Sequence, residues 1–339
     1  MNKFLKFISE NILPSKAPSF WREKNDIAQL LLPFSLIYFL VKRLIPKCKN
    51  PKNFNAKIIC IGNAIAGGAG KTPTAIAIYN FLKLNNPSKK IAFINTGYKG
   101  ILYGAVLVDN KNHKPSEVGD EAYLLSQTGD CIMCKNRLQA CEYAESLGYE
   151  ILILDDGLHD ERIIKDFSLC VFDGNYAIGN GMVMPAGPLR DRLDFCLKDV
   201  NDILIIGEHS EDLPKRIEKL SRKKLEFHNA YIEITSNHNK EIAYTAFAGI
   251  GNPEKFFKTL ENIGLSVVEK VIFPDHHKYY QDDFNHLKTL AEAEKSQLIT
   301  TEKDYIKLSD EMKKITDYTK MRINISSQNL LAKINELVK

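Results

Sequence analysis

Short, continuous apolar runs recur along the middle of the chain, and each is bounded by glycine or by polar residues. The runs cover residues 57–62, 90–95, 150–155, 167–173 and 202–207. Strands that are buried on both faces have this uninterrupted pattern, because helices cover each side of a parallel sheet. We therefore expect these runs to form one parallel sheet.

Helical periodicity fills the segment between the first two runs. Ala75, Ile78, Tyr79 and Leu82 recur at intervals of three and four residues within 72–84, so they share one face of a helix. Strands that alternate with such helices predict an α/β fold, in which a parallel sheet carries helices on both faces.

A second series of strands and helices follows the strongly charged stretch 208–224. We expect strands at 226–232, 244–251, 266–273 and 297–301, helices at 253–263 and 281–293, and a last helix at 327–338 that packs on either unit. The pattern thus predicts an N-terminal segment (1–50), a first domain (51–225) and a second, smaller α/β domain (226–339).

The apolar stretch 27–41 is about 15 residues long, short of the roughly 20 that a membrane-spanning helix needs. Pro33 lies inside it, Trp21 and Arg22 precede it, and basic residues follow it, namely Lys42, Arg43, Lys47, Lys49 and Lys52. An aromatic residue and cations around a short apolar segment indicate a helix that lies in a membrane interface. The alternative is an apolar helix that packs on its own domain.

The first 14 residues lack the pattern of a cleaved signal peptide, since Lys6, Glu10 and Asn11 interrupt the apolar positions and no small-residue cleavage site follows. The net charge is only +4 over 339 residues, which gives no reason to expect a nucleic-acid partner and does not oppose an anionic membrane. Seven scattered cysteines, with one CxxC pair at Cys131 and Cys134, indicate a reducing compartment. A zinc site requires a second cysteine pair or histidines at suitable spacing, and the sequence offers neither beside this pair.

A glycine-rich segment between the first strand and the first helix carries the strongest chemical signal. It reads Gly67, Gly68, Ala69, Gly70, Lys71, Thr72 and Pro73. Glycines let successive backbone N–H groups surround phosphate oxygens, and the helix N-terminus adds its positive dipole end. The segment therefore predicts a phosphate-binding loop (P-loop) in which Lys71 reaches the phosphates and Thr72 reaches Mg²⁺, although Ile65 stands where the strict pattern has glycine.

Carboxylates at two places are candidates for the chemistry that such a loop needs. Asp155 and Asp156 stand at the carboxyl end of the strand predicted at 150–155, the sheet edge where ligands of parallel α/β folds bind, so we expect them near the metal. Asp120 follows a glycine and begins a helical segment, where it is either a helix cap or a catalytic group.

Three further segments present charged side chains on loops. Arg190 and Asp191 follow two prolines and a glycine, where Arg190 is suited to neutralise a phosphoryl group or to form an ordinary surface ion pair. Asp275 and His276 follow a predicted strand as an acid–base candidate, and residues 301–304 follow another.

The ordered series of motifs resembles the lipid A 4'-kinase (tetraacyldisaccharide 4'-kinase) family over residues 14–310. The series comprises Pro18-Ser19-Phe20-Trp21, Gly62-Asn63 with the P-loop, Thr96-Gly97-Tyr98-Lys99-Gly100, Val118-Gly119-Asp120-Glu121, Asp155-Asp156-Gly157-Leu158, Pro185 to Arg190, Ala246 to Pro253, Pro274-Asp275-His276 and Thr301-Glu302-Lys303-Asp304. Each motif alone is weak, but the order is specific.

The resemblance implies a cytoplasmic enzyme, peripheral on the inner membrane, that uses ATP and Mg²⁺ to phosphorylate the 4'-hydroxyl of a tetraacyl disaccharide 1-phosphate. It implies that Asp120 is the catalytic base, paired with His276, and that Lys71 and Arg190 bind the phosphates. It also implies that Thr72, Asp155, Asp156 and Asp191 lie at the metal, and that Tyr98 and Asn63 lie near the substrate. We further expect the chain to be a monomer.

The chain departs from the family pattern at three places. His159-Asp160 replaces the usual Gln-His, Asp191 stands where Glu is usual, and Thr96 stands where Arg is usual. The competing interpretation is a membrane-associated P-loop ATPase or GTPase switch without a lipid acceptor. A GTPase would carry an NKxD segment, of which residues 301–304 are a partial echo.

Overall fold

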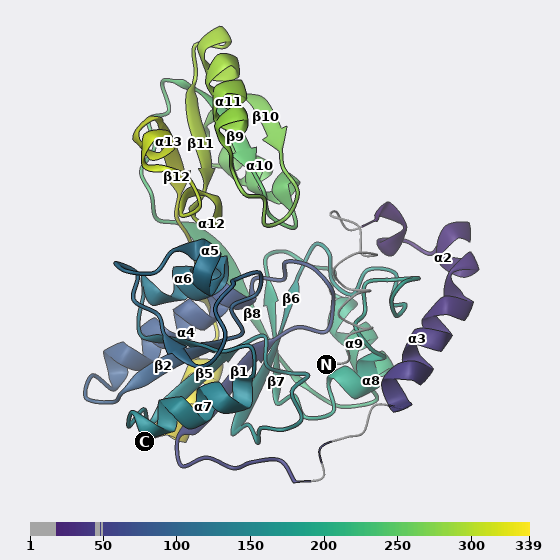
Figure 1. Ribbon diagram of the computed structural model, residues 1–339. Coiled ribbons are helices and arrows are strands. Elements are labelled where there is room, and N and C mark those ends of the chain that lie inside the picture. The colour runs from purple at the N-terminus through teal and green to yellow at the C-terminus, as the bar shows by residue number, and fades with distance from the viewer. Residues whose placement is uncertain (1–17, 45–47, 49) are drawn as a thin grey trace.

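A computed structural model describes residues 18–44, 48 and 50–339 of the chain. The expectations for residues 1–14, and for Lys47 and Lys49 of the basic cluster, lie outside the described residues. A large sheet with its helices forms the lower body in Figure 1, and a smaller sheet with its helices stands above it.

The large sheet has the strand order β13-β8-β7-β6-β1-β5-β2-β4-β3. Its strands are β1 (Lys57–Gly62), β2 (Ile91–Asn95), β3 (Val106–Leu107), β4 (Cys131–Met133), β5 (Ile151–Asp155), β6 (Phe167–Asp173), β7 (Asp202–Ile206), β8 (Glu226–Ile234) and β13 (Met321–Ile325). All strands from β8 to β4 run parallel, and the two edge strands are antiparallel. The predicted parallel sheet is therefore confirmed.

Helices cover both faces of this sheet, as the continuous apolar runs predicted (Figure 1). They are α4 (Lys71–Asn85), α5 (Pro115–Val118), α6 (Asp120–Ser126), α7 (Arg137–Ser146), α8 (Leu193–Cys196), α9 (Leu213–Ser221) and α14 (Gln328–Val338). Alternate residues of β1 divide between the two faces: Ile59 and Ile61 pack with α4 and α14, while Ile58 and Cys60 pack with α7.

The smaller domain contains a four-stranded parallel sheet of order β10-β9-β11-β12. Its elements are β9 (Ala243–Ala248), α10 (Pro253–Asn262), β10 (Ser266–Ile272), α11 (Gln281–Ala293), β11 (Gln297–Thr301), α12 (Glu302–Tyr305), α13 (Asp310–Ile315) and β12 (Thr316–Thr319). Two separate apolar clusters, one around Phe256 and Phe257 and one around Phe284 and Leu287, form its core.

The domain boundary expected at residue 226 is wrong. Residues 226–234 form β8, which pairs in parallel with β7, so they belong to the large sheet. The charged stretch 208–224, after which a second unit was expected, contains the surface helix α9, whose exposed side carries part of those charges while Leu213 and Ile217 are buried. The chain also returns to the large sheet through β13, and α14 packs on α4 there.

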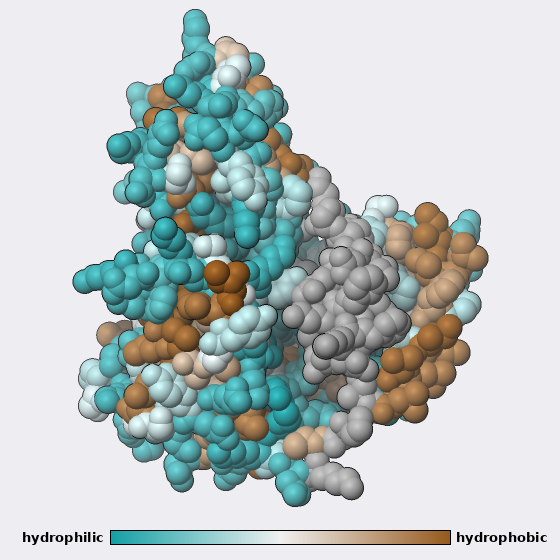
Figure 2. Space-filling view, viewed as in Figure 1, coloured by the Kyte–Doolittle hydropathy of each residue, from teal (hydrophilic) through white to brown (hydrophobic). Residues whose placement is uncertain are grey.

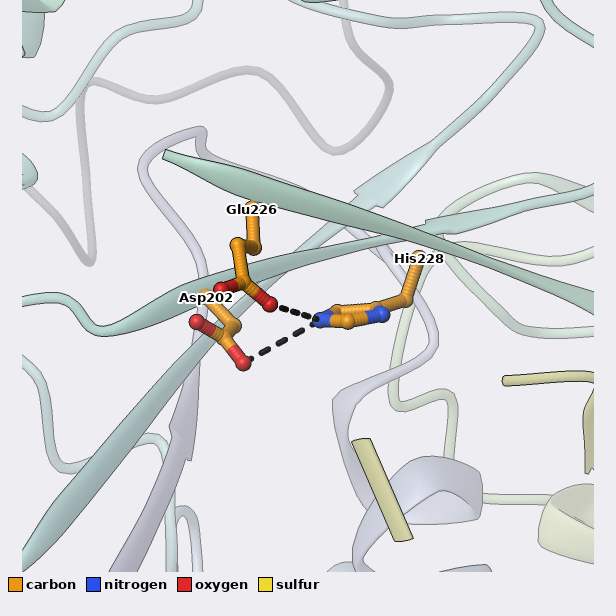
Figure 3. A group of neighbouring side chains, drawn as sticks. All are labelled: Asp202, Glu226 and His228. Atoms are coloured by element: carbon orange, nitrogen blue, oxygen red, sulfur yellow. Dashed lines mark hydrogen bonds and ion pairs between the residues drawn. The ribbon is translucent and has the colours of Figure 1, made fainter. Parts of the chain in front are cut away.

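The helix α14 is held at the start of β7 and β8 by a polar cluster of Asp202, Glu226, His228 and Lys333. Figure 3 shows Asp202 and Glu226 converging on His228. One nitrogen or oxygen atom of each of the three side chains lies within 4.8 Å of the others. The ammonium of Lys333 lies 3.1 Å from Asp202 Oδ2 and 2.6 Å from Glu226 Oε2. The chain thus supplies its own cation to a group of side chains that would otherwise suit a metal ion.

We expect Lys333→Met to lower the free energy of unfolding by about 1–2 kcal/mol. This is less than the roughly 3–5 kcal/mol typical of a broken buried pair, because Lys333 is partly exposed. Burial alone would raise the pKa of Asp202, but hydrogen bonds from His228 and Lys333 lower it. The stabilisation is therefore present at neutral pH and is lost as the pH falls below the ordinary range of Asp, about 4.

Urea denaturation at pH 7 checks this effect, with the exposed Glu336→Gln on the same helix as the control. Equal midpoints for Lys333→Met and the control would contradict it.

Candidate active site

The P-loop joins β1 to the N-terminus of α4. Gly67 has φ +119° and Gly70, which caps α4, has φ +86°, a backbone region in which side chains are strained. A Cβ on Gly70 would also lie 2.6 Å from Ile206 Cδ1. The loop is therefore shaped as the glycines predicted, with the backbone N–H groups of a 15-residue helix at its end.

Ile65, which stands where the strict P-loop motif has glycine, helps to hold the loop in place. Ile65 is buried and forms an isolated antiparallel bridge with Leu189. Its carbonyl oxygen also accepts a hydrogen bond from Arg190 Nε at 3.1 Å. The approach to the P-loop is therefore fixed by the loop that carries Arg190.

Two cations and one carboxylate meet beside the P-loop. Arg190 Nη1 lies 3.2 and 3.1 Å from the two oxygens of Asp156, and Lys71 Nζ lies 3.8 Å from Asp156 Oδ2. Burial alone would raise the pKa of Asp156, but Arg190, Lys71 and Arg137 together hold it well below its usual range. Lys71 and Arg190 are thus gathered where phosphates would bind.

Asn63 was expected near the substrate, and the structure places it beneath the loop instead. Its side chain is fully buried, its amide donates to the carbonyl oxygen of Gly67 at 3.4 Å, and its Oδ1 accepts from Lys71 Nζ at 3.4 Å. Asn63 therefore supports the P-loop and orients Lys71.

Asp155 ends β5 in a pocket of polar groups. Its Oδ2 accepts hydrogen bonds from Thr72 Oγ1 at 2.9 Å and from Asn95 Nδ2 at 3.1 Å, while Oδ1 is buried with no hydrogen-bond partner among the described residues. Burial, with the negative charge of Glu121, raises the pKa of Asp155 to about 7. A buried carboxylate oxygen of this kind, beside a threonine hydroxyl, fits a hard divalent cation.

Asp120 and His276 meet across the two domains. His276 Nδ1 lies 3.1 Å from Asp120 Oδ2, and both side chains are largely buried. His276 has φ +59°, and its backbone N–H donates to the carbonyl oxygen of Gly249. The ring of Tyr98 stands edge-on to His276, with 5.3 Å between centroids. The structure thus forms the pair that the resemblance implied and places the half-exposed Tyr98 beside it.

Close backbone packing fixes Asp120 at the start of α6. A Cβ on Gly119 would lie 2.7 Å from the carbonyl oxygen of Tyr98, and a Cβ on Gly100 would lie 2.6 Å from the nitrogen of Gly119. These two glycines let the Tyr98 loop and the Asp120 turn touch through their main chains.

The small domain also contacts the large one near the P-loop. A Cβ on Gly251 would lie 3.5 Å from the nitrogen of Gly68, so the loop after β9 lies over the P-loop. Lys255 of α10 pairs with the buried Asp173 at the end of β6, and Lys303 of α12 pairs with Glu121 of α6 at 3.1 Å. The P-loop and the Asp120–His276 pair are therefore parts of one interdomain site.

Asp191, which was expected at the metal, pairs with two cations in the structure. Its two carboxylate oxygens pair with Lys42 at 3.0 Å and Arg43 at 2.9 Å, both on α3 (Leu32–Leu44). The side chain is nearly buried in this arrangement and serves to attach α3. The sequence could not reveal this, because the partners are far apart along the chain, Arg43 and Asp191 by 148 residues.

Two polar residues of the site escaped the sequence interpretation. Asn95 ends β2 beside Asp155, and the same rule that selected Asp155, a polar residue at the carboxyl end of a buried strand, would have found it. Lys303 belongs to the motif at residues 301–304, but the direction of its side chain depends on how the two domains dock.

Residues 301–304, which partly match a guanine-reading motif, have a structural role. Asp304 is fully buried, accepts from the backbone N–H of Gly249 at 3.0 Å and from Thr301 Oγ1 at 2.7 Å, and pairs with Lys307 at 2.6 Å. A carboxylate engaged in this way is not presented to a base, which disfavours the GTPase interpretation.

Comparison with known proteins gives one consistent result. The family model described as tetraacyldisaccharide-1-P 4'-kinase (LpxK) matches residues 27–339. The tetraacyldisaccharide 4'-kinase of Rickettsia canadensis is 39% identical over 93% of this chain and 94% of its own, and that of Rickettsia bellii is 36% identical over 93% and 96%.

A crystal structure of LpxK from Aquifex aeolicus, in complex with ATP, has a similar fold, with a TM-score of 0.70. The likeness covers 92% of this chain and 99% of that one, at 22% identity. The P-loop, the paired domains and the extent of these matches agree, and the chain therefore belongs to the tetraacyldisaccharide-1-P 4'-kinase family.

Proposed function

We propose that the chain transfers the γ-phosphoryl group of ATP to the 4'-hydroxyl of a tetraacyl disaccharide 1-phosphate, a step of lipid A synthesis. Family membership supports the reaction class. The observation that carries the mechanism is the Asp120–His276 pair, which lies at the domain interface where the loop of Gly251 covers Gly68 of the P-loop.

In this mechanism Asp120 is the general base. It accepts the proton of the sugar hydroxyl as the new O–P bond forms and the bond between the γ-phosphorus and the β–γ bridging oxygen breaks, which releases ADP. A sugar hydroxyl is a poor nucleophile, so a positioned carboxylate contributes about 10²–10⁴-fold. His276 comes from the other domain, so the base is completed only when the domains are together.

Lys71 and Arg190 neutralise the phosphates. Asp156 holds both cations in place before ATP arrives, because it pairs with each of them. Fixed charges that need no rearrangement are the main source of rate in phosphoryl transfer. Tyr98, half exposed beside His276, is placed to contact the sugar acceptor.

Thr72 and Asp155 are the residues we assign to Mg²⁺, since the partnerless Asp155 Oδ1 and the Thr72 hydroxyl fit its preference for oxygen ligands. When bound, the ion would neutralise charge on the β- and γ-phosphate oxygens. Asp156 is engaged by Arg190 and Lys71, so we assign it to those cations instead.

The helix α3 supports attachment to a membrane surface. With α2 (Asp26–Leu30) it exposes a continuous apolar face, brown at the right of Figure 2, made of Ile27, Leu30, Leu32, Phe34, Leu36, Ile37, Leu40 and Leu44. Its polar side faces the protein: Ser35 Oγ donates to the carbonyl oxygen of Val183 at 2.7 Å, and Lys42 and Arg43 bind Asp191. A helix packed on its own domain would have the opposite orientation, so that alternative is disfavoured.

No helix among the described residues is long and apolar enough to span a bilayer. A peripheral position on the cytoplasmic face of the inner membrane is what we propose, with the apolar face of α3 in the lipid interface.

We expect the double variant Leu36→Glu, Leu40→Glu to bind anionic vesicles at least about tenfold more weakly, because two leucines would no longer enter the apolar layer and two like charges would be added. Sedimentation with vesicles measures the effect. The control is Leu84→Glu with Leu220→Glu, which adds the same charge at exposed leucines of α4 and α9. Equal sedimentation of the two variants would contradict the proposed surface.

A phosphotransfer assay tests the function itself. The purified chain, ATP, Mg²⁺ and the disaccharide 1-phosphate in mixed micelles should yield a 4'-phosphorylated product. Folded protein that binds ATP and hydrolyses it without phosphorylating the acceptor would contradict the kinase and support the switch.

A further inference from the structure

Lys303 lies between His276 and Glu121, outside the groups that bind phosphate or accept the proton. It is the second residue of α12, the short helix that follows β11 and contacts α6 of the large domain (Figure 1). Its Nζ lies 3.1 Å from Glu121 Oε1 and 3.5 Å from His276 Nε2. The side chain is mostly buried, so these neighbours rather than water determine what it does.

The turn that carries Lys303 is held from both sides. Thr301 Oγ1 accepts a hydrogen bond from the backbone N–H of Asp304 at 3.0 Å, which caps α12. Glu302 binds Arg322 of β13, in the large sheet, at 2.8 and 3.3 Å. These contacts limit the movement of α12 and hold the Lys303 ammonium at the interface.

The chemistry of an ammonium determines the hydrogen bonding of the imidazole beside it. Lys303 offers donors only, so His276 Nε2, which faces it, is placed to accept. In a neutral imidazole the proton then lies on Nδ1, the atom 3.1 Å from Asp120 Oδ2. The carboxylate of Asp120 accepts from that N–H and keeps its other oxygen for the substrate.

The other groups that face His276 do not replace this contact. Asp275 Oδ1 lies 3.9 Å from His276 Nε2, beyond hydrogen-bond distance, and as an acceptor it would favour a proton on Nε2, the opposite tautomer. Tyr98 approaches the ring edge-on. Lys303 is thus the donor that the geometry supplies to Nε2.

We propose that Lys303 is a positioning residue for phosphoryl transfer: by donating to Nε2 it acts together with the Asp120 carboxylate at Nδ1 to fix the Nδ1–H tautomer of His276, and thereby orients Asp120. The ion pair with Glu121, the neighbour of Asp120 on α6, adds a second tie between the domains at the same point. The proposal rests on the base role of Asp120 proposed above.

The test compares Lys303→Met, which keeps the length of the side chain and removes its charge and donors, with Lys303→Arg, which restores both. The control is Lys314→Met, at an exposed position of the same domain. We expect Lys303→Met to lower kcat about 10–100-fold, as loss of an orienting partner does at other sites. The KM for ATP should stay within about twofold, and Lys303→Arg should recover most of the rate.

Imidazole ¹⁵N spectra provide a readout that a merely structural role would not move. The signals of His276, assigned from the His276→Gln spectrum, should show Nδ1–H in the parent protein and in Lys303→Arg, and a mixture of tautomers in Lys303→Met. An unchanged tautomer or an unchanged kcat in Lys303→Met would overturn the proposal. A Glu121→Gln variant that lost as much rate as Lys303→Met, with the His276 signals unaltered in both, would show that the pair acts only by joining the domains, which would also overturn it.

The same experiments separate this proposal from the proposed function. If Asp120→Asn and His276→Gln retain full kinase activity, the base assignment fails. If those variants are inactive and Lys303→Met is not, the base assignment stands and the role of Lys303 fails alone.

Discussion

Asp120→Asn should lower kcat for acceptor phosphorylation about 10²–10⁴-fold, while the affinity for ATP stays within about twofold. The amide keeps the size of the carboxylate and its contact with His276 Nδ1 at 3.1 Å, but it has no useful basicity toward the sugar hydroxyl. ATP affinity should hold because the P-loop, Lys71 and Arg190 are untouched. Steady-state kinetics with the disaccharide 1-phosphate and calorimetric titration with ATP give the two numbers.

The matched control is Asp199→Asn, which makes the same change at a largely exposed carboxylate. A parallel loss of kcat and of ATP affinity in Asp120→Asn would mean that Asp120 holds the nucleotide site together. Full activity in Asp120→Asn would remove Asp120 from the chemistry.

The sequence predicted the phosphate side of this site because local patterns determine it. The glycines of the P-loop are required by the backbone angles of Gly67 and Gly70, and the polar end of a buried strand places Asp155 at the ligand-binding edge. Strand and helix together fix the positions of Lys71 and Thr72 within a few residues. Each of these features lies within one strand–loop–helix unit.

The acceptor side depends on contacts that no local pattern contains. Asp120 and His276 are 156 residues apart, and only the resemblance to a family paired them. Asp191 was expected at the metal from the same resemblance, yet it binds two cations of α3. Its partners come from a helix whose polar side turns inward, which a hydrophobic pattern alone does not reveal.

The domain boundary was misplaced for a related reason. A strongly charged stretch suggested that a second unit begins after it, but an amphipathic surface helix, α9, carries part of those charges and belongs to the large domain. The chain leaves the large sheet only after β8 and re-enters it at β13, next to β8. The small domain is therefore an insertion tethered at both ends to one sheet edge, which restricts how it can move relative to the P-loop.

Because the small domain is attached at one sheet edge, the interdomain contacts determine how it is placed over the P-loop. Lys255 with Asp173, Lys303 with Glu121, and His276 with Asp120 all join the small domain to the ends of elements in the large one. Loss of any one contact should affect the acceptor step more than ATP binding, because the P-loop, Lys71 and Arg190 all belong to the large domain.

Lys71→Met should lower kcat about 10³-fold or more and, unlike Asp120→Asn, should also weaken ATP binding. The ammonium of Lys71 is oriented by Asn63 at 3.4 Å and by Asp156 at 3.8 Å, and little of the side chain is exposed, so its charge acts on the phosphates with little screening by water. Cationic groups placed at the transferring phosphoryl group contribute about 10³–10⁵ in rate in related chemistry. Methionine keeps the apolar stem and removes only the charge and the donors.

The control for Lys71→Met is Lys83→Met, at the other end of the same helix, where the ammonium donates to the carbonyl oxygens of Pro87 and Lys89. Circular dichroism and thermal melting should show both variants folded. Since both oxygens of Asp156 would keep their hydrogen bonds from Arg190 Nη1, the site should not collapse when Lys71 is lost. Near-normal turnover by Lys71→Met would mean that the phosphates are held elsewhere, and the assignment of the P-loop as the nucleotide site would then fall.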